Sequence, residues 1–395
     1  MPPTLPSVSD SALTIEEVAS QLQSAGVRRI HVLAWRDLDD PDAGGSEVHA
    51  DEFSRRWAEV GFDIVHRTSS LAGVRSAHER NDYRVCSRGG RLSVFPRVIG
   101  SELLRREGSY DAMVEVWNGV PWFTPLWVRR PKVVFLHHVH GPMWNQILPK
   151  PIAGLGRALE ARMAPPFYRR TLVLTPSDAT RDELLELGFR PERVQAIPNG
   201  VDPSFCPGGA RSKVPLVLAV GRLAPVKRFE ALVDSVVHAR RVVPGLKLQI
   251  VGSGPLEGPL REQIARHGAQ EYIHFLGHVG HQELIDLYRS AWVVSSASLA
   301  EGWGLTLTQA AACGTPAVAT DISGHRSSVV DGVTGVLAPV ERLGDALADV
   351  LTDGELRARL GAAARERAIT LTWDRVARDM LSALAGEASR RRSAS

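Results

Sequence analysis

Residues 298–314 place an acidic side chain and two glycines where a loop gives way to a helix. A strand pattern ends near Ser295, the loop at 301–304 reads Glu-Gly-Trp-Gly, and a helical pattern begins near Leu305. Glycines let backbone N–H groups approach a diphosphate, and the positive end of the helix dipole favours its charge. The Glu301 carboxylate precedes these N–H groups, so it can accept hydrogen bonds from hydroxyls of the same ligand.

Two cations occupy another strand-to-helix junction, at residues 221–227. Arg222 and Lys227 are five positions apart, so a planar guanidinium and a compact ammonium can converge on one diphosphate. Gln309, on the second turn of the helix expected after Leu305, can face the same ligand. These residue types indicate a ligand with both phosphates and hydroxyls, although exposed Arg and Lys are more often simply solvated.

Three further turns that follow expected strands contain glycine. Gly44 and Gly45 stand where a helix begins, and the free N–H groups of a helix N-terminus can hold an anion. Each turn is a weak signal by itself, because glycine also serves simply to reverse the chain. The other two turns contain Gly252 and Gly254, and Gly277, His278 and Val279.

Residues 135–140 read Phe-Leu-His-His-Val-His at the end of an expected strand. Acidic and cysteine residues do not cluster nearby in the sequence, so we expect no metal site there. Successive side chains on a strand point to opposite faces, so only one of His137 and His138 should face a ligand. We favour His137, because it follows directly on the strand.

A second strand end in the same half of the chain suggests where another substrate would bind. Glu115 and Asn118 close a strand pattern. With His138, Trp122 and Trp144 they could line an acceptor site, since aromatic faces stack on sugars. Tryptophans are at least as common in cores, so a purely structural role stays open.

The bulk composition is that of a soluble globular protein large enough for two domains. The chain has 395 residues, of which 44% are hydrophobic and 23% are charged, with a net charge of +3. That charge is too small to indicate nucleic-acid binding, but residues 84–170 hold 14 Lys and Arg against five Asp and Glu. This local excess suggests contact with an anionic membrane surface, although solvated charge explains it equally well.

The cysteines and the apolar runs bear on where the protein works. Cys86, Cys206 and Cys313 are widely spaced and form no Cys-X-X-Cys motif, so we expect neither a disulfide framework nor a zinc site. We find no signal-peptide pattern, and no apolar run approaches the ~20 residues that span a bilayer. The expectation is a cytoplasmic protein, peripheral at most on the inner face of the cell membrane.

Strand patterns alternate with helical patterns along the chain, which predicts an α/β fold with parallel sheets. A Pro- and Gly-rich linker at residues 198–215 separates two domains, residues 28–200 and 201–372, with a hinge near Asn199 and Gly200. Ligands bind at the carboxyl ends of parallel strands, so the two sheets should face a shared cleft. Outside the domains we expect an N-terminal extension at 1–27, a helix at 373–386 that packs back on the first domain, and a basic flexible tail at 387–395.

In order and spacing, residues 298–337 resemble the donor site of the GT4-type retaining glycosyltransferases, which have the GT-B fold of two Rossmann-like domains. The family motif is a Glu, seven residues and a second Glu around a glycine loop, and this chain has Gln309 at the second acid. The resemblance covers nearly the whole chain from about Arg28 onward. It implies that Glu301 binds hydroxyls of the transferred sugar and that the backbone at 302–305 binds the diphosphate. The implied donor-binding residues are Gly44, Gly45, Gly252, Gly254, His278, Val279, Gly302, Trp303, Gly304, Leu305 and Gln309.

The resemblance also implies roles for the cations and for one histidine. Arg222 and Lys227 would stabilise the departing nucleoside diphosphate, because negative charge grows on it as the glycosidic bond breaks. An amide at position 309 can still contact the ribose diol, but without the charge-assisted bond of a carboxylate. No metal ion or other cofactor is implied. The expected catalytic set is Glu301, His137, Arg222 and Lys227, and the expected acceptor set is Glu115, Asn118, His138 and Trp144.

We therefore expect a retaining, metal-independent hexosyltransferase that uses a UDP- or GDP-sugar. The acceptor would be a hydroxyl of a glycan or of a lipid-linked molecule, in the synthesis of cell-envelope glycolipid or polysaccharide. Two alternatives stay open. A GT-B-fold phosphorylase would need a pyridoxal lysine, and an epimerase would release a changed sugar nucleotide without an acceptor. A catalytically weak scaffold subunit that binds sugar nucleotides is favoured only by Gln309.

Overall fold

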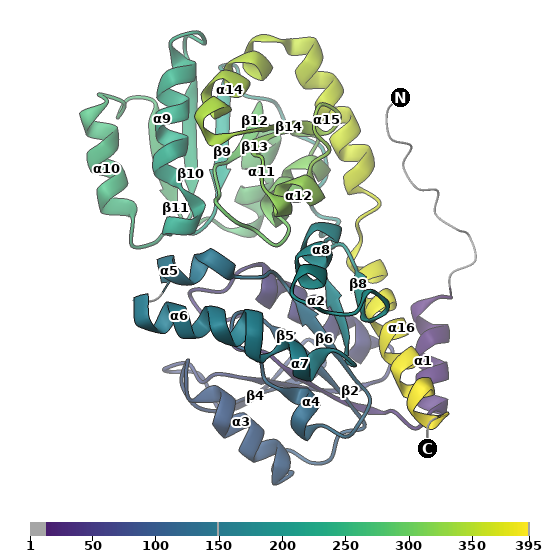
Figure 1. The fold of residues 1–395 in the computed structure, drawn as a ribbon. Helices are drawn as coiled ribbons and strands as arrows, with labels where there is room; N and C mark the ends of the chain where they lie inside the picture. Colours follow the sequence, from purple (N-terminus) through teal and green to yellow (C-terminus); the bar gives the residue numbers. More distant parts are fainter. Residues whose placement is uncertain (1–12, 148–149, 394–395) are drawn as a thin grey trace.

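The protein forms two α/β domains, one above the other in Figure 1, joined by a linker and by a long C-terminal helix. The computed structural model describes residues 13–147 and 150–393. The predicted fold class of two successive Rossmann-like domains is confirmed. Within these residues, none of the helices is both long and apolar enough to cross a membrane.

The first domain is built on an eight-stranded sheet in the order β3-β4-β2-β1-β5-β6-β7-β8. Neighbouring strands are parallel except β3 and β4, which form an antiparallel hairpin at one edge. The strand order reverses between β1 and β5, and such a switch point opens a crevice at the carboxyl ends of the strands. The strands are β1 (Arg29–Leu33), β2 (Asp63–Thr68), β3 (Ala77–Arg80), β4 (Tyr83–Ser87), β5 (Ala112–Trp117), β6 (Lys132–Leu136), β7 (Leu172–Thr175) and β8 (Val194–Ala196).

Helices cover both faces of this sheet, because its central strands are apolar on both sides. The helix predicted to begin at the Gly44–Gly45 pair is α2 (Gly45–Glu59), which buries Phe53 and Trp57. The other helices are α1 (Ile15–Ser24), α3 (Val94–Leu103), α4 (Thr124–Trp127), α5 (Trp144–Ile147), α6 (Lys150–Ala158), α7 (Pro165–Tyr168) and α8 (Asp178–Glu186). Shorter turns lie at Gly141–Met143, Leu159–Met163 and Pro191–Arg193.

The second domain has a six-stranded, fully parallel sheet in the order β11-β10-β9-β12-β13-β14. This is the Rossmann strand order, with its switch point between β9 and β12. The strands are β9 (Leu216–Val220), β10 (Lys247–Val251), β11 (Ile273–Gly277), β12 (Val293–Ser296), β13 (Ala317–Thr320) and β14 (Gly335–Ala338). The helices are α9 (Phe229–Arg240), α10 (Glu257–Arg266), α11 (His281–Ser290), α12 (Leu305–Ala312), α13 (Ser323–Ser328), α14 (Leu343–Thr352) and α15 (Gly354–Ala368), with short turns at Pro225–Lys227 and Val340–Arg342.

Helix α16 (Trp373–Arg392) leaves the second domain and packs along the first, against α1, α2 and β6 (Figure 1). Trp57 of α2 anchors it, because its indole Nε1 donates to the carbonyl of Ala377 at 2.9 Å. The helix expected to pack back on the first domain is therefore present. The flexible tail expected from residue 387 is wrong for residues 387–392, which are helical, since Ala388 is buried in the first-domain core and prolongs the apolar stripe.

The edge hairpin of β3 and β4 does not show in the sequence pattern. Strand β3 reads Ala-His-Glu-Arg and has no apolar run, because its side chains alternate between exposed and half-buried positions. Polar contacts hold it instead. Arg80 donates from both terminal nitrogens to the two carboxylate oxygens of Asp37, at 2.7 and 2.8 Å.

Two buried histidines make the first domain sensitive to acid. His49 packs against Phe135 and Trp373, and neither of its ring nitrogens has a partner in the described part of the chain. Burial lowers the pKa of His49 to about 3, and burial also lowers the pKa of His66 to about 4. An unfolded histidine titrates near 6.5, so below that pH the unfolded chain binds more protons than the folded one, and stability is lost.

We expect the free energy of unfolding to fall by about 2 kcal/mol between about pH 6.5 and about pH 5 through His49 alone. Replacing His49 by leucine should remove this part of the dependence, because leucine keeps apolar packing and binds no proton. Urea denaturation at the two pH values measures the change. His274→Leu on β11, where the side chain is exposed, is the control. An equally steep pH dependence in H49L and the unchanged protein would contradict the prediction.

Candidate active site

The switch point of the second sheet brings together the two segments singled out from the sequence. The loop after β9 carries Lys227, and the loop after β12 carries Glu301. Because β9 and β12 are adjacent, these loops leave the same edge of the sheet side by side. Lys227 Nζ donates a hydrogen bond to Glu301 Oε1, and the same oxygen accepts from Ser298 Oγ at 2.8 Å.

The charge state of Glu301 is the outcome of opposing effects. Burial alone would raise the pKa of Glu301, but the charges of Lys227 and His325, with hydrogen bonds from Lys227 and Ser298, outweigh burial and lower it. The carboxylate is therefore ionised at neutral pH. Its second oxygen, Oε2, takes part in no hydrogen bond among the described residues. An ionised carboxylate with an unused oxygen can accept a strong hydrogen bond from a ligand hydroxyl.

Neighbouring segments fix the loop that carries Glu301. The Leu299 N–H donates to the Val226 carbonyl at 2.8 Å, which ties this loop to the one after β9. Gly324 packs so closely that a Cβ there would overlap the Glu301 carbonyl. Gly304 precedes α12 with a φ of +96°, a left-handed conformation that favours glycine. The position of the carboxylate is thus set by backbone contacts as well as by its ion pair.

The predicted glycine turns after β9 and β10 pack against each other. A Cβ at Gly252 would overlap the Gly221 carbonyl, and a Cβ at Gly254 would lie 2.5 Å from the Leu223 carbonyl oxygen. The Gly252 N–H already donates to the Gly277 carbonyl at 2.7 Å. These glycines therefore let three strand ends come together, and the N–H of Gly252 is not open to a ligand.

The first domain meets this edge with the N-terminus of α2. Gly45 lies against Leu305, the first residue of α12, so that a Cβ at Gly45 would be 2.9 Å from Leu305 Cδ1. Arg222 lies 3.7 Å from Asp42, in the loop that leads to α2. Two helix N-termini, each the anion-favouring end of its helix, therefore lie together at the boundary between the domains.

The histidines at the end of β6 lie where the two domains touch. Gly302 of the Glu301 loop packs on their backbone. A Cβ at Gly302 would overlap the His137 carbonyl oxygen and lie 3.3 Å from His138 Cβ. Only glycine lets the second-domain loop come this close to the first domain.

The rings of His137 and His138 point to different neighbours, as the pleat predicts. The His137 ring meets His49 edge-on at 5.0 Å between centroids, whereas the His138 ring stacks on His140 at 4.2 Å. Burial is the main reason why the pKa of each ring lies well below its usual value, and the charge of Lys227 adds to this only at His138. The charge of Lys227 thus acts on the ring of His138, which makes His138 a candidate beside the favoured His137 for the contact with a ligand.

Glu115 is not available to an acceptor. Its side chain is fully buried, and Oε1 accepts hydrogen bonds from the Trp122 N–H at 2.8 Å and the Tyr168 hydroxyl at 2.7 Å. Oε2 accepts from the hydroxyl of Thr124. Trp122 is fully buried as well. The prediction that these two residues line an acceptor site is wrong, because residue 115 faces the segment around α4 and not the ligand edge.

The other acceptor candidates differ in what their side chains contact. Asn118 Nδ2 donates to Ser46 Oγ at 2.8 Å, which places it at the N-terminus of α2. The Trp144 indole is 5% exposed, and its Nε1 donates to Glu160 at 3.2 Å while its ring lies against His140. Asn118 therefore stays a candidate, whereas the indole of Trp144 belongs to the packing of its own loop.

Four donor candidates differ in how far their side chains are free to contact a ligand. Gln309 Oε1 accepts from the Tyr288 hydroxyl at 3.1 Å, which leaves its Nε2 to donate to a ligand. The Trp303 side chain is 4% exposed within the second-domain core, so only its backbone can meet a donor. His278 is exposed on the turn after β11, and Val279 beside it is half-buried.

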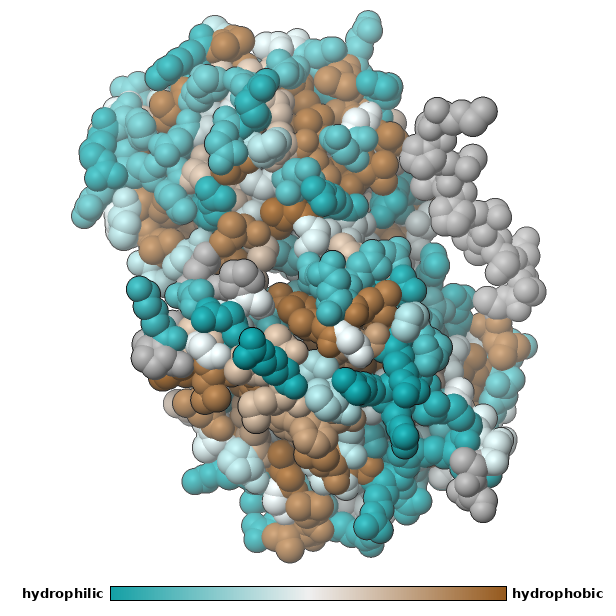
Figure 2. Space-filling model, viewed as in Figure 1, coloured by the Kyte–Doolittle hydropathy of each residue, from teal (hydrophilic) through white to brown (hydrophobic). Residues whose placement is uncertain are grey.

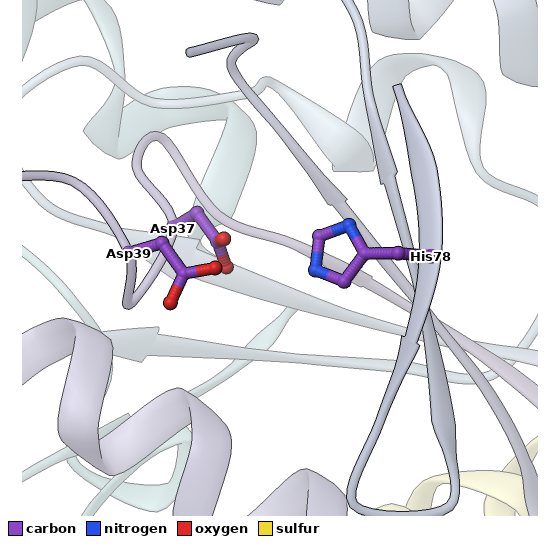
Figure 3. A group of neighbouring side chains, drawn as sticks. All are labelled: Asp37, Asp39 and His78. Carbon is purple, nitrogen blue, oxygen red and sulfur yellow. The ribbon is translucent and has the colours of Figure 1, made fainter. Parts of the chain in front are cut away.

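One group of possible metal ligands lies elsewhere in the first domain. Asp37, Asp39 and His78 have ligand atoms within 4.8 Å of one another (Figure 3). Arg80 already donates to both acids, to Asp37 at 2.7 Å and to Asp39 at 2.6 Å. A guanidinium therefore balances these carboxylates, and we assign no metal to them.

Several residues of the site carry no signal of their own in the sequence. Tyr288 donates to Gln309 and His325 lies beside Gly304 of the Glu301 loop, and both come from other elements, so only the fold reveals them. Glu47 is different. Its carboxylate accepts from the Gly44 N–H at 2.8 Å, and an acid three residues into a helix is the usual signature of a capping box.

Comparison with known proteins finds a glycosyltransferase family in each half of the chain. Residues 43–205 match the family described as Glycosyltransferase Family 4, and residues 205–367 match Glycosyl transferases group 1. A D-inositol 3-phosphate glycosyltransferase of Kribbella flavida is 31% identical over 415 aligned residues, covering 90% of this chain and 95% of its own. A glycogen synthase of Mycobacterium tuberculosis is 35% identical, over 52% of this chain and 51% of its own.

Solved structures share the arrangement of the two domains. Sucrose-phosphate synthase from Thermosynechococcus elongatus has a TM-score of 0.77 at 20% identity, covering 93% of this chain and 99% of its own. Anabaena HepE, solved in complex with UDP and glucose, has a TM-score of 0.72 at 20% identity, covering 91% and 100%. The predicted GT-B fold is thereby confirmed. With sequence matches across both domains, the chain belongs to the family 4 glycosyltransferases, of the group 1 type.

Proposed function

We propose that this glycosyltransferase is a retaining hexosyltransferase that moves a hexose from a UDP- or GDP-sugar to an acceptor hydroxyl. The observation that supports this most is the ionised Glu301, paired with Lys227 at the Rossmann switch point beside the N-terminus of α2. The similar fold of Anabaena HepE, solved with UDP and glucose, supports a nucleotide-sugar donor.

In this proposal Lys227 and Arg222 stabilise the leaving nucleoside diphosphate. Negative charge grows on the diphosphate as the glycosidic bond breaks, and charges already in place stabilise it at little reorganisation cost. Lys227 lies in the loop that follows β9, and Arg222 in the same loop has a side chain that is 45% exposed and so can turn towards the phosphates. The N-termini of α2 and α12 add favourable dipoles.

The sugar would lie between Glu301 and the histidines. Glu301 Oε2 would accept a hydrogen bond from a sugar hydroxyl, and His138 is our choice for the contact first predicted for His137. We propose a front-face reaction in which the leaving phosphate takes the proton of the acceptor hydroxyl, so that the anomeric configuration is retained. Lys227 and Arg222 supply the positive charge that a divalent metal would otherwise bring.

The acceptor would bind on the first domain, next to Asn118 at the start of α2. Several relatives carry the name D-inositol 3-phosphate glycosyltransferase, so a phosphorylated cyclitol is an acceptor class to test. The other class is a glycan or lipid-linked acceptor of the cell envelope. To decide between the two classes, acceptors of both are incubated with the active donor, and the glycosylated product is measured for each.

Proton NMR of the glycosylated product tests the proposed stereochemistry and metal independence together. We expect the product to keep the donor's anomeric configuration and the rate to be unchanged when EDTA is added. An inverted product, or activity that EDTA abolishes and a divalent ion restores, would rule out this mechanism. Donor binding without any transfer would favour a scaffold subunit.

Gln309→Glu is expected to tighten the binding of the nucleoside diphosphate about five- to tenfold, because a hydrogen bond to an ionised group is worth about 1 kcal/mol more than a neutral one. The Tyr288 hydroxyl, which now donates to Gln309, can donate to the new carboxylate. Isothermal titration with UDP and GDP measures the change. Gln270→Glu, exposed in the same domain, adds the same charge as a control. Equal or weaker binding by Q309E would contradict the ribose contact.

A further inference from the structure

Arginines from three separate segments meet on the first domain, at the end of α16. The Arg390 guanidinium donates to the carbonyl of Arg170 at 3.3 Å, and that of Arg391 donates to the carbonyl of Arg129. These bonds join the last turn of α16 to the second residue after α4 and the second residue after α7. We call this set the arginine cluster, and its members are Arg129, Arg130, Arg169, Arg170, Arg390, Arg391 and Arg392.

Within the described residues, the four arginines that follow α4 and α7 have no acidic partner. Glu387 lies on α16, and its carboxylate is shared between Arg193 at 2.8 Å and Arg390 at 3.3 Å. In the part of the chain that the structure describes, no ion pair joins a carboxylate to the four arginines that follow α4 and α7. These four side chains are exposed, and they are Arg129, Arg130, Arg169 and Arg170.

The surrounding segment is also short of acids. Residues 124–170 contain eight Lys and Arg but a single acid, Glu160. Glu160 is buried and accepts from the N–H groups of His140 and Gly141 at 2.8 Å each, so it offers no charge to the surface. Like charges gathered without counter-charges repel one another, and an anionic partner relieves that repulsion.

Exposed apolar side chains stand next to the arginine cluster. Leu126 on α4 is 61% exposed and lies three residues before Arg129, and Phe167 on α7 is 46% exposed and lies two residues before Arg169. Helices α4 and α7 are in contact, and the Phe123 and Phe167 rings are 6.0 Å apart. Figure 2 shows apolar side chains over α4 on the lower domain. Further exposed apolar residues along α6 and the turn after it are Ile152, Leu155 and Met163.

We propose that the arginine cluster, with Leu126 and Phe167 beside it, docks the protein on an anionic lipid bilayer. Guanidinium groups bind lipid phosphates through paired hydrogen bonds, and apolar side chains next to them enter the headgroup region. A nucleic acid would use the cations but would gain little from two exposed apolar side chains. The docking surface does not include Glu301 or Lys227. Membrane binding can therefore be tested independently of the donor chemistry.

Vesicle flotation with the full chain tests this surface. The variant replaces Arg129, Arg130, Arg169 and Arg170 by glutamine, which preserves the carbonyls that Arg390 and Arg391 contact. The unchanged protein should float with phosphatidylglycerol-containing vesicles and not with pure phosphatidylcholine. Since each arginine contributes about fivefold to the affinity for an anionic surface, the variant should bind at least about a hundredfold more weakly.

A control variant removes the same four charges from exposed positions of the second domain. These positions are Arg241, Arg266, Arg359 and Arg365. The control should float like the unchanged protein, and both variants should release nucleoside diphosphate normally with a soluble acceptor. Leu126→Ser with Phe167→Ser should weaken the binding that remains at high salt. Equal flotation of the two arginine variants would overturn the proposal, as would equal binding to neutral vesicles or binding to an oligonucleotide alone.

Discussion

Glu301→Gln is expected to lower the turnover number by about a hundredfold to a thousandfold, the usual cost of removing one preorganised charge contact at a reacting centre. Glutamine has nearly the same shape, but it carries no charge to hold Lys227 or to accept a strong hydrogen bond from a sugar hydroxyl. Steady-state kinetics with the preferred donor measures the loss. The melting temperature should change little, because the loop is also held by backbone bonds such as that from Leu299 to Val226.

Ser298→Ala is the matched control for that substitution. It removes only the hydroxyl that donates to Glu301 Oε1 at 2.8 Å and leaves both the carboxylate and Lys227 in place. We expect a loss of roughly tenfold at most, in line with one neutral hydrogen bond. If E301Q turned over within a few-fold of the unchanged enzyme, Glu301 would have no part in the reaction.

Gly302→Ala is expected to lower turnover by at least about tenfold while the affinity for free nucleoside diphosphate stays the same. A methyl group at position 302 would overlap the His137 carbonyl oxygen, and backbone cannot yield as the end of a side chain can. The second domain would still bind the nucleotide, but its loop could no longer reach the first domain. Titration calorimetry and initial rates separate the two effects.

Substitutions of two other glycines serve as controls for Gly302→Ala. Gly45→Ala would meet the flexible end of Leu305 at 2.9 Å, so its effect should be mild. Gly258→Ala on α10 meets nothing within 4 Å and should have no effect. A G302A enzyme that is as fast as G258A would show that contact between these domains is not needed, and parallel loss of nucleotide affinity would place the damage in the donor loop itself.

The sequence predicted the parts of the fold that depend on apolar patterning. Strands 132–136 and 216–220 are buried along all or nearly all of their length, and apolar runs of this kind are what sequence patterning detects. The junctions that carry Glu301 and Lys227 were found because glycines, charges and a helix start coincide there. The edge strand β3 was missed because it is held by the ion pairs of Arg80 and has no apolar pattern.

Other features could not be predicted because they depend on the direction of side chains or on contacts made only in the fold. Glu115 ends an apolar strand and looked available, but both of its oxygens are taken by the segment around α4. His137 and His138 could not be separated by sequence, because the choice depends on which ring is close to Lys227 in another domain. The tail after residue 387 was judged by its charge, whereas buried Ala388 and backbone acceptors keep it helical.

The measurement that tests the account most directly is the release of nucleoside diphosphate from a panel of UDP- and GDP-hexoses, with acceptor present, by the unchanged protein and by E301Q. We expect one donor to support release, and we expect E301Q to lose nearly all of this release while still binding the nucleotide. The role of Glu301 in a transfer reaction would be contradicted if no donor were turned over by a protein that binds UDP or GDP, or if the Glu301 variant released product as fast as the unchanged enzyme.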